Sequence, residues 1–124
     1  MLTQKILVVE DSWTELTMIV ASLRKNGFDV VTARDGQEAL ERVITERPDG
    51  IVLDVVLPKQ SGFQVCRKLK GWEGSRHIPI LMLSGKKTPL DVSWGLRQGA
   101  DMYLTKPCDE DELVARVRQL VAGR

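Results

Sequence analysis

Three acidic residues stand directly after apolar runs of this sequence, where their side chains can act together. Glu10 and Asp11 follow the run 6–9, and Asp54 follows the run 51–53. Carboxylates that converge repel one another, by roughly 4 kcal/mol per pair at 4 Å for an effective dielectric near 20, so they require a cation. An all-oxygen set with so few carboxylates favours Mg²⁺, which keeps several of its waters, over Ca²⁺.

Ser84 and Lys106 follow two later apolar runs and add groups that suit a phosphoryl group. The lysine supplies a positive charge and the serine a hydroxyl donor, and with Mg²⁺ they would surround a planar, negatively charged group. The simplest chemistry makes Asp54 the nucleophile and yields an aspartyl phosphate. Taken alone, Asp54 also fits the start of a turn and Lys106 an exposed lysine, so the surrounding elements decide between the two interpretations.

Five apolar runs predict the strands that position these side chains. Runs rich in β-branched residues and without internal alternation are typical of strands covered on both faces, as in a parallel sheet. The strands are expected at residues 5–9, 29–33, 51–54, 78–84 and 102–105. Because such sheets bind ligands beyond the carboxyl ends of their strands, the polar residues at those ends define the expected site.

Apolar residues at helical spacing predict a helix after each strand. Ser12 and Glu15 match a capping box at the start of the first helix, and Asn26-Gly27 ends it. The side chains expected to face inward are Leu16, Ile19, Val20, Leu23, Ala39, Leu40, Val43, Ile44, Phe63, Cys66, Leu69, Val92, Leu96, Leu113, Val117, Leu120 and Val121. Strands alternating with helices predict a doubly wound α/β fold, with right-handed crossovers and helices on both faces of a parallel sheet.

The composition is that of one ordinary globular domain. With 18 basic and 17 acidic residues, the 124-residue chain carries a net charge of +1, which gives no indication of nucleic acid as a partner. No apolar run approaches the roughly 20 residues of a membrane span, and no signal peptide is visible, so we expect a cytoplasmic protein without membrane insertion. The two cysteines, Cys66 and Cys108, are expected to be reduced.

Four motifs together resemble the receiver domain of two-component response regulators, the CheY-like family. The motifs are Val8-Val9-Glu10-Asp11-Ser12, Leu53-Asp54-Val55-Val56-Leu57-Pro58 with Gly62, Leu83-Ser84-Gly85, and Tyr103-Leu104-Thr105-Lys106-Pro107. Each stands at the end of a predicted strand, and the resemblance covers essentially the whole chain. It implies a flavodoxin-like sheet with five strands in the order 2-1-3-4-5. It also implies a single receiver domain over residues 1–124 with no output domain.

The resemblance assigns the acidic residues to two roles. Asp54 would be the phosphoacceptor, and Glu10 and Asp11 would form the acidic pair. Asp11 and Asp54 would bind Mg²⁺ directly, together with the backbone carbonyl of Val56. Glu10 would act on the ion through water.

The resemblance also assigns the residues that respond to the phosphoryl group. Ser84 matches the hydroxyl residue that moves toward it, and Tyr103 matches the aromatic switch that moves inward at the same time. Lys106 matches the lysine that binds the phosphate, and the Lys106-Pro107 peptide bond is expected to be cis.

A place in a signalling pathway is implied as well. A sensor histidine kinase would donate the phosphoryl group, so the chain would be a phosphoacceptor switch with at most self-phosphorylation and autodephosphorylation activity. The signal would leave through residues 89–98, 102–105 and 109–121, where Trp94 and Tyr103 are expected to contact a downstream protein. The segment around Trp94 is similar to single-domain regulators of type IV pilus motility and phototaxis, which favours a motility or chemotaxis-type pathway. The protein is expected to be a monomer or a weak, phosphorylation-linked dimer.

Alternatives on the same fold remain open at this point. A phosphorylation-independent binding module, or a phosphate sink for a shared kinase, would have the same elements. A haloacid-dehalogenase-type phosphatase needs a second Asp where this chain has Val56. A dinucleotide-binding half needs a glycine-rich turn after the first strand, where Glu10 and Asp11 would repel a pyrophosphate. Val56 and Lys86 occupy positions that tune water access in the family, and they do not determine the lifetime of the modified state.

Overall fold

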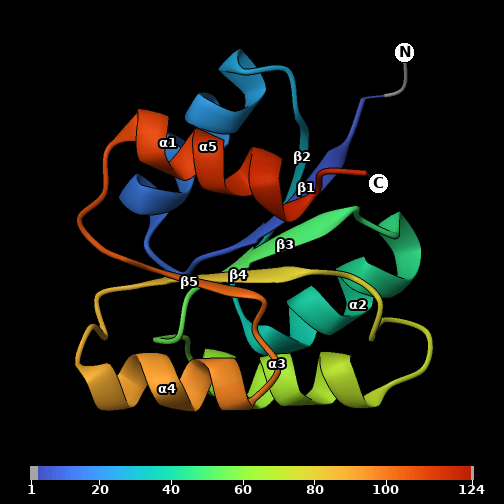
Figure 1. The fold of residues 1–124 in the computed structure, drawn as a ribbon. Coiled ribbons are helices and arrows are strands. Elements are labelled where there is room, and N and C mark those ends of the chain that lie inside the picture. The colour runs from blue at the N-terminus through green and yellow to red at the C-terminus, as the bar shows by residue number, and fades with distance from the viewer. Residues whose placement is uncertain (1–2, 124) are drawn as a thin grey trace.

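The computed structural model describes residues 3–123 and contains a five-stranded sheet. The strands are β1 (Lys5–Val9), β2 (Asp29–Ala33), β3 (Gly50–Leu53), β4 (Ile80–Ser84) and β5 (Met102–Thr105). Neighbouring strands are parallel, and their order across the sheet is β2-β1-β3-β4-β5. The expected α/β sheet and its strand order are therefore confirmed (Figure 1).

Two strands differ from the predicted bounds. β3 ends at Leu53, so Asp54 is the first residue beyond the strand and not its last member. β4 begins at Ile80, two residues later than predicted. Pro79 has no N–H to donate to a neighbouring strand, although its carbonyl still accepts from the Ile51 N–H at 3.0 Å.

Five helices cover the two faces of the sheet. They are α1 (Trp13–Lys25), α2 (Gly36–Glu46), α3 (Gly62–Gly71), α4 (Pro89–Arg97) and α5 (Glu110–Leu120). α1 and α5 lie on one face, and α2, α3 and α4 lie on the other (Figure 1). Within residues 3–123, no helix combines the length and the apolar character needed to cross a membrane.

The core consists of two apolar clusters, one on each face of the sheet. Successive residues of a strand point to opposite faces. Ile6 and Val8 of β1 therefore pack with α1 and α5, whereas Leu7 and Val9 pack with α2 and α3. All four side chains are fully buried, which explains why these runs show no polar alternation.

Two side chains predicted to face inward are exposed. Ile44 of α2 is 57% exposed and Leu96 of α4 is 46% exposed. Each follows a buried residue, Val43 in α2 and Gly95 in α4. Neighbouring helical residues point about 100° apart, and in these two pairs the second side chain is turned toward solvent. Helical spacing marked the apolar side of the helix but did not identify which residue reaches the core.

Only one of the two hydrogen bonds of the capping box predicted at α1 is present. Ser12 is the N-cap, and its Oγ accepts a hydrogen bond from the Glu15 N–H at 3.4 Å. The Glu15 side chain does not return to Ser12, because it pairs with Lys106 Nζ at 3.1 Å. The Ser12 N–H donates instead to Glu10 Oε2 at 3.0 Å. Full capping boxes occur at the starts of α3 and α4, where the sequence had not predicted them.

Candidate functional site

Four neighbouring strands end in polar residues at the same edge of the sheet. Glu10 follows β1, Asp54 follows β3, Ser84 is the last residue of β4, and Lys106 follows β5. The strands are parallel, so their carboxyl ends meet at one edge. Glu10, Asp54 and Ser84 are all buried, with at most 7% of each residue exposed. The edge therefore holds polar groups that are almost withdrawn from water.

Lys106 links the acidic residues of this edge. Its Nζ lies 2.6 Å from Glu10 Oε1, 3.1 Å from Glu15 Oε1 and 3.3 Å from Asp54 Oδ2. The ammonium thus connects the end of β5 with the ends of β1 and β3 and with the first turn of α1. The peptide bond between Lys106 and Pro107 is cis, as expected.

Burial and neighbouring charges shift the pKa values of Glu10 and Lys106. Burial raises the pKa of Glu10, and the hydrogen bonds from Lys106 and the Ser12 N–H only partly offset this. Burial alone would lower the pKa of Lys106, but the hydrogen bond to Glu10 and the charge of Asp54 outweigh it and raise that pKa above its usual value. Lys106 is therefore held in its charged form.

The loop after Asp54 fixes the orientation of its carboxylate. Oδ1 accepts a hydrogen bond from the Val56 N–H at 3.2 Å, while Oδ2 faces Lys106. The Gly62 N–H donates to the Val55 carbonyl at 2.8 Å. A Cβ on Gly62 would collide with the Asp54 carbonyl oxygen, so only glycine allows this close approach. The sequence motif included Gly62, but it did not predict that a glycine is needed for this close approach.

Asp11 lies at the exposed rim of the site. Its backbone carbonyl accepts from Arg34 Nη2 at 2.7 Å, and the Arg34 guanidinium lies 5.5 Å from the centroid of the Trp13 ring. Of the three carboxylates expected to converge, Glu10 and Asp54 both lie against Lys106 Nζ, so the lysine stands between them. Among residues 3–123, no three His, Cys, Asp or Glu side chains are arranged to hold a metal ion.

The donor set is nevertheless compatible with a hard cation. Glu10, Glu15 and Asp54 share the single positive charge of Lys106, so the site keeps excess negative charge. Its donors are carboxylate and carbonyl oxygens, which Mg²⁺ prefers. The residues present therefore fit the expected ion by charge and by donor type.

Ser84 and Tyr103 continue the site toward α4. Ser84 Oγ accepts from the Lys86 N–H at 3.2 Å, and its carbonyl accepts from the Lys106 N–H at 2.9 Å. The Tyr103 hydroxyl donates to the Lys86 carbonyl. Burial and the charge of Asp91 raise the pKa of Tyr103. Ser84 and Tyr103 thus meet at Lys86, although they come from different strands.

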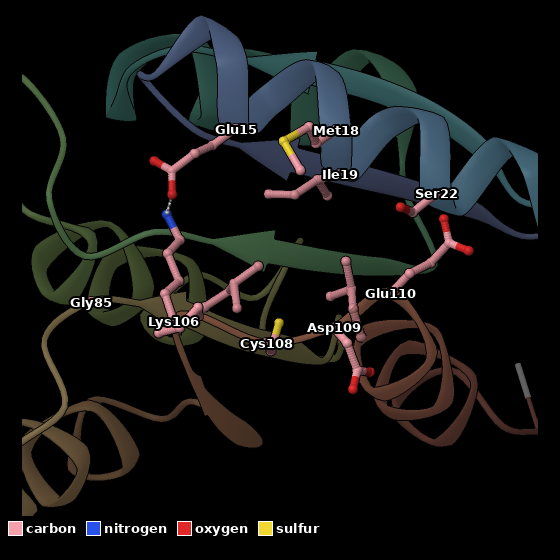
Figure 2. A pocket seen from close by; sticks show the side chains of 12 residues that line it. Glu15, Met18, Ile19, Ser22, Gly85, Lys106, Cys108, Asp109 and Glu110 are labelled. Carbon is pink, nitrogen blue, oxygen red and sulfur yellow. Dashed lines mark ion pairs between the residues drawn. The ribbon is translucent and has the colours of Figure 1, made fainter.

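Sequence reasoning missed an apolar groove beside Lys106 (Figure 2). The groove has a volume of about 650 Å³ and runs between α1 and the segment that leads into α5. Met18 and Ile19 line one side, Cys108 lies on the other, and the ion pair of Glu15 with Lys106 closes one end (Figure 2). Burial raises the pKa of the Cys108 thiol, which makes it a weak nucleophile.

The predicted site residues therefore fall into four positions. Glu10, Asp54 and Lys106 form the buried cluster. Asp11 and Val56 lie exposed at its rim. Ser84 and Tyr103 lie next to it under α4, and Trp94, which is 48% exposed, lies on the outer side of that helix.

Comparisons with known proteins identify relatives over nearly the whole chain. A family model described as the response regulator receiver domain matches residues 6–118. The alkaline phosphatase synthesis transcriptional regulatory protein PhoP of Bacillus subtilis is 45% identical over 120 residues, which are 97% of this chain and 49% of PhoP. The chain thus spans about half the length of that relative.

Other matches cover both proteins almost completely. Protein PilH of Pseudomonas aeruginosa is 38% identical over 119 residues, which are 96% of this chain and 98% of PilH. A receiver domain of a sensor histidine kinase from the same species was solved with a magnesium ion coordinated in the active site cleft. That structure matches with a TM-score of 0.90 and 31% identity, over 98% of this chain and 100% of that chain.

Proposed function

Because this chain belongs to the response regulator receiver domain family, we propose that it is a signalling switch that uses Asp54 as its phosphoacceptor. Receiver domains accept phosphate from sensor histidine kinases and are switches, generally not enzymes. The observation that carries the proposal is the distance of 3.3 Å between Asp54 Oδ2 and Lys106 Nζ. A buried nucleophilic carboxylate beside a fixed positive charge suits phosphoryl transfer.

The chemistry proposed for Asp54 is a single displacement. One carboxylate oxygen attacks the phosphorus of a phosphohistidine, and a P–O bond forms as the P–N bond breaks. The imidazole of the donor leaves with the electron pair. Lys106 stays protonated and pairs with the transferred group, while the Val56 N–H keeps the carboxylate oriented from its Oδ1 side.

Receiver domains bind Mg²⁺ at the active site, and the oxygen donors found here suit that ion. We propose that the carboxylates of Asp11 and Asp54 and the carbonyl of Val56 would hold the ion, and that Glu10 would act on it through water. When bound, Mg²⁺ supplies positive charge that offsets repulsion between the acidic residues and an incoming phosphoryl group. Lys106 provides the rest of the compensating charge.

The proposed output passes from Ser84 and Tyr103 to the surface of α4, β5 and α5. A new anion beside Lys106 attracts the Ser84 hydroxyl, and Tyr103 shares Lys86 with Ser84 as a hydrogen-bond partner. The outer side of α4 exposes Leu90 by 78% and Trp94 by 48%. Exposed large apolar side chains on one helix are typical of a surface that binds a protein partner.

The pathway is proposed from the relatives. The match to PilH over nearly its whole length supports a motility or chemotaxis-type pathway related to pili. A second candidate is the receiver part of a transcriptional regulator, which is supported by the 45% identity to PhoP. Purification with and without beryllofluoride, a stable mimic of the acyl phosphate, followed by identification of the bound protein, distinguishes the two.

The phosphoacceptor role is tested with a small phosphodonor. Incubation with acetyl phosphate and Mg²⁺ should add the mass of one phosphoryl group, and this gain should vanish in Asp54→Asn. Asp49→Asn serves as the control. It removes a carboxylate that lies away from the site, where it accepts from the Lys5 N–H, so this variant should still gain the mass of one phosphoryl group. A protein that gains no mass at any Mg²⁺ concentration would be a phosphorylation-independent binding module.

A further inference from the structure

Gly95 lies in the last turn of α4 and is the buried residue of that helix. Glycine in a helix interior disfavours the helix relative to alanine, because it gains no side-chain contacts and loses more backbone freedom. A glycine at this place therefore calls for a packing reason. The surroundings of Gly95 supply one.

A Cβ on Gly95 would lie 2.8 Å from Met82 Sδ and 2.8 Å from both Cδ2 and Cε2 of Tyr103. These distances are too short for van der Waals contact, so alanine would displace the ring, the sulfur or the helix. The Tyr103 ring thus packs directly on the backbone of α4. No side chain of α4 stands between the ring and the helix at this point.

Tyr103 is also held at its other end. Its hydroxyl donates to the Lys86 carbonyl in the loop before α4, and the Lys86 N–H donates to Ser84 Oγ. The ring therefore contacts the helix at Gly95 and the loop at Lys86. A movement of Ser84 or Tyr103 changes the space available to α4 at both points.

We infer that Gly95 is the positioning residue of the switch: it leaves the space in which the Tyr103 ring packs against α4. This inference rests on the proposed function, in which Ser84 and Tyr103 respond to the modified Asp54. That response requires that the space under α4 stay open to the ring. Any side chain at residue 95 competes with the ring for that space and uncouples the Trp94 side of α4 from Asp54.

The single tyrosine of the sequence makes a direct test possible. The full chain is labelled with 3-fluorotyrosine, so that one protein ¹⁹F resonance reports on Tyr103. The same spectrum shows bound beryllofluoride, which is titrated in the presence of Mg²⁺. In the unsubstituted protein the Tyr103 resonance should shift as beryllofluoride binds.

In Gly95→Ala the Tyr103 resonance should already be displaced before beryllofluoride is added. The beryllofluoride midpoint should rise about fivefold or more, because the bound state needs the ring position that the new Cβ excludes. Gly71→Ala is the matched control, since Gly71 ends α3 and a Cβ there would meet nothing within 4 Å. Gly71→Ala should keep both the resonance positions and the midpoint.

Rescue separates positioning from a general packing defect. In a Tyr103→Ala background the ring is absent, so adding Gly95→Ala should leave the beryllofluoride midpoint unchanged. If Gly95→Ala weakens binding equally in both backgrounds, or leaves the Tyr103 resonance and midpoint as in the unsubstituted protein, the inference is wrong. If the unsubstituted protein does not bind beryllofluoride at all, the proposed function fails instead. Far-ultraviolet circular dichroism checks that each variant is folded, and the double variant remains testable because it removes the collision with the ring.

Discussion

Helices α4 and α5 both flank β5, but they are held to the sheet in different ways. α5 buries Leu113, Val114, Val117 and Leu120, whereas α4 buries Gly95. Tertiary packing of an apolar face provides most of a helix's stability, so α5 is firmly anchored and α4 weakly anchored. The difference shows which part of the expected partner surface can move at low cost, and that part is α4.

The two helices also differ in how they connect to the acidic cluster. Lys106 stands just before α5 and ties that end of the chain to Glu10 and to Glu15 of α1. α4 is connected to the cluster indirectly, through Tyr103 and the loop at Lys86. The firmly anchored helix α5 therefore follows the charged residue Lys106, whereas the weakly anchored helix α4 exposes the apolar residues of the expected partner surface.

The largest expected effect tests the anchoring itself. Leu113→Ala in α5 should lower the free energy of unfolding by about 3 kcal/mol, because it leaves a cavity in the core. Leu96→Ala in α4 should change it by less than about 0.5 kcal/mol, because that side chain is already exposed. Urea denaturation followed by circular dichroism measures both. Equal losses would mean that α4 is anchored as firmly as α5.

The second effect concerns the charges beside α5. Lys106→Met should lower the free energy of unfolding by about 2 kcal/mol at pH 7 without Mg²⁺, since it leaves Glu10 and Asp54 buried without a counter-charge. This loss is smaller than the roughly 3 to 5 kcal/mol expected when a fully buried ion pair is broken, because Lys106 is partly accessible to water. Urea midpoints at matched ionic strength measure the loss.

An exposed lysine provides the control for Lys106. Lys25 pairs with Glu110 at 3.4 Å, and 73% of the lysine side chain is exposed. Lys25→Met should cost less than about 0.5 kcal/mol, as is usual for surface ion pairs. A similar small loss in Lys106→Met would show that the buried acidic residues do not depend on the lysine.

The two cysteines report on the two helices separately. Cys66 is fully buried and its Sγ lies 3.6 Å from the Gln98 carbonyl at the end of α4, whereas Cys108 is partly exposed just before α5. A thiol reagent should modify Cys66 at least about tenfold more slowly than Cys108, which corresponds to about 1.4 kcal/mol. Beryllofluoride should change the rate at Cys66 and leave Cys108 nearly unaffected. A change at Cys108 alone would assign the motion to α5.

The pH dependence at Cys66 follows from its burial, which raises its pKa from 9.0 to about 11. The thiolate is the reactive form, so the modification rate should rise with pH up to that value. Because the folded pKa lies above the unfolded one, the folded state binds more protons between these two values. The contribution of Cys66 to stability is therefore complete below about pH 9 and is lost as pH rises toward about 11. Cys66→Val should remove this part of the pH dependence of the urea midpoint.

A small effect on stability is expected at the partner surface. Trp94→Ala should lower the free energy of unfolding by about 1 kcal/mol or less, because nearly half of the residue is exposed. The phosphoryl mass gain should persist, but capture of a partner that depends on beryllofluoride should be lost. Trp72→Ala is the matched control, at 49% exposure beyond the end of α3, and should retain the partner. Loss in both variants would point to a general effect of removing tryptophan.

Much of the fold follows from local patterns. Apolar runs located all five strands, although β3 lies one residue earlier than predicted at both ends and β4 begins two residues later than predicted. Residues at the strand ends identified Asp54 and Lys106 before their distance was known. The errors at Ile44 and Leu96 have one cause, since helical spacing marks a wide apolar side and only packing selects the residue that is buried.

Taken alone, the sequence determined which polar residues end the strands, since a run of buried apolar residues and its polar boundary depend on neighbours in the chain. Only the tertiary structure decided that Glu15 pairs with Lys106 and not with Ser12, and that Gly95 makes room for Tyr103. These contacts join residues from separate elements. Their energies depend on distances between side chains, and those distances exist only after the sheet and helices have packed together.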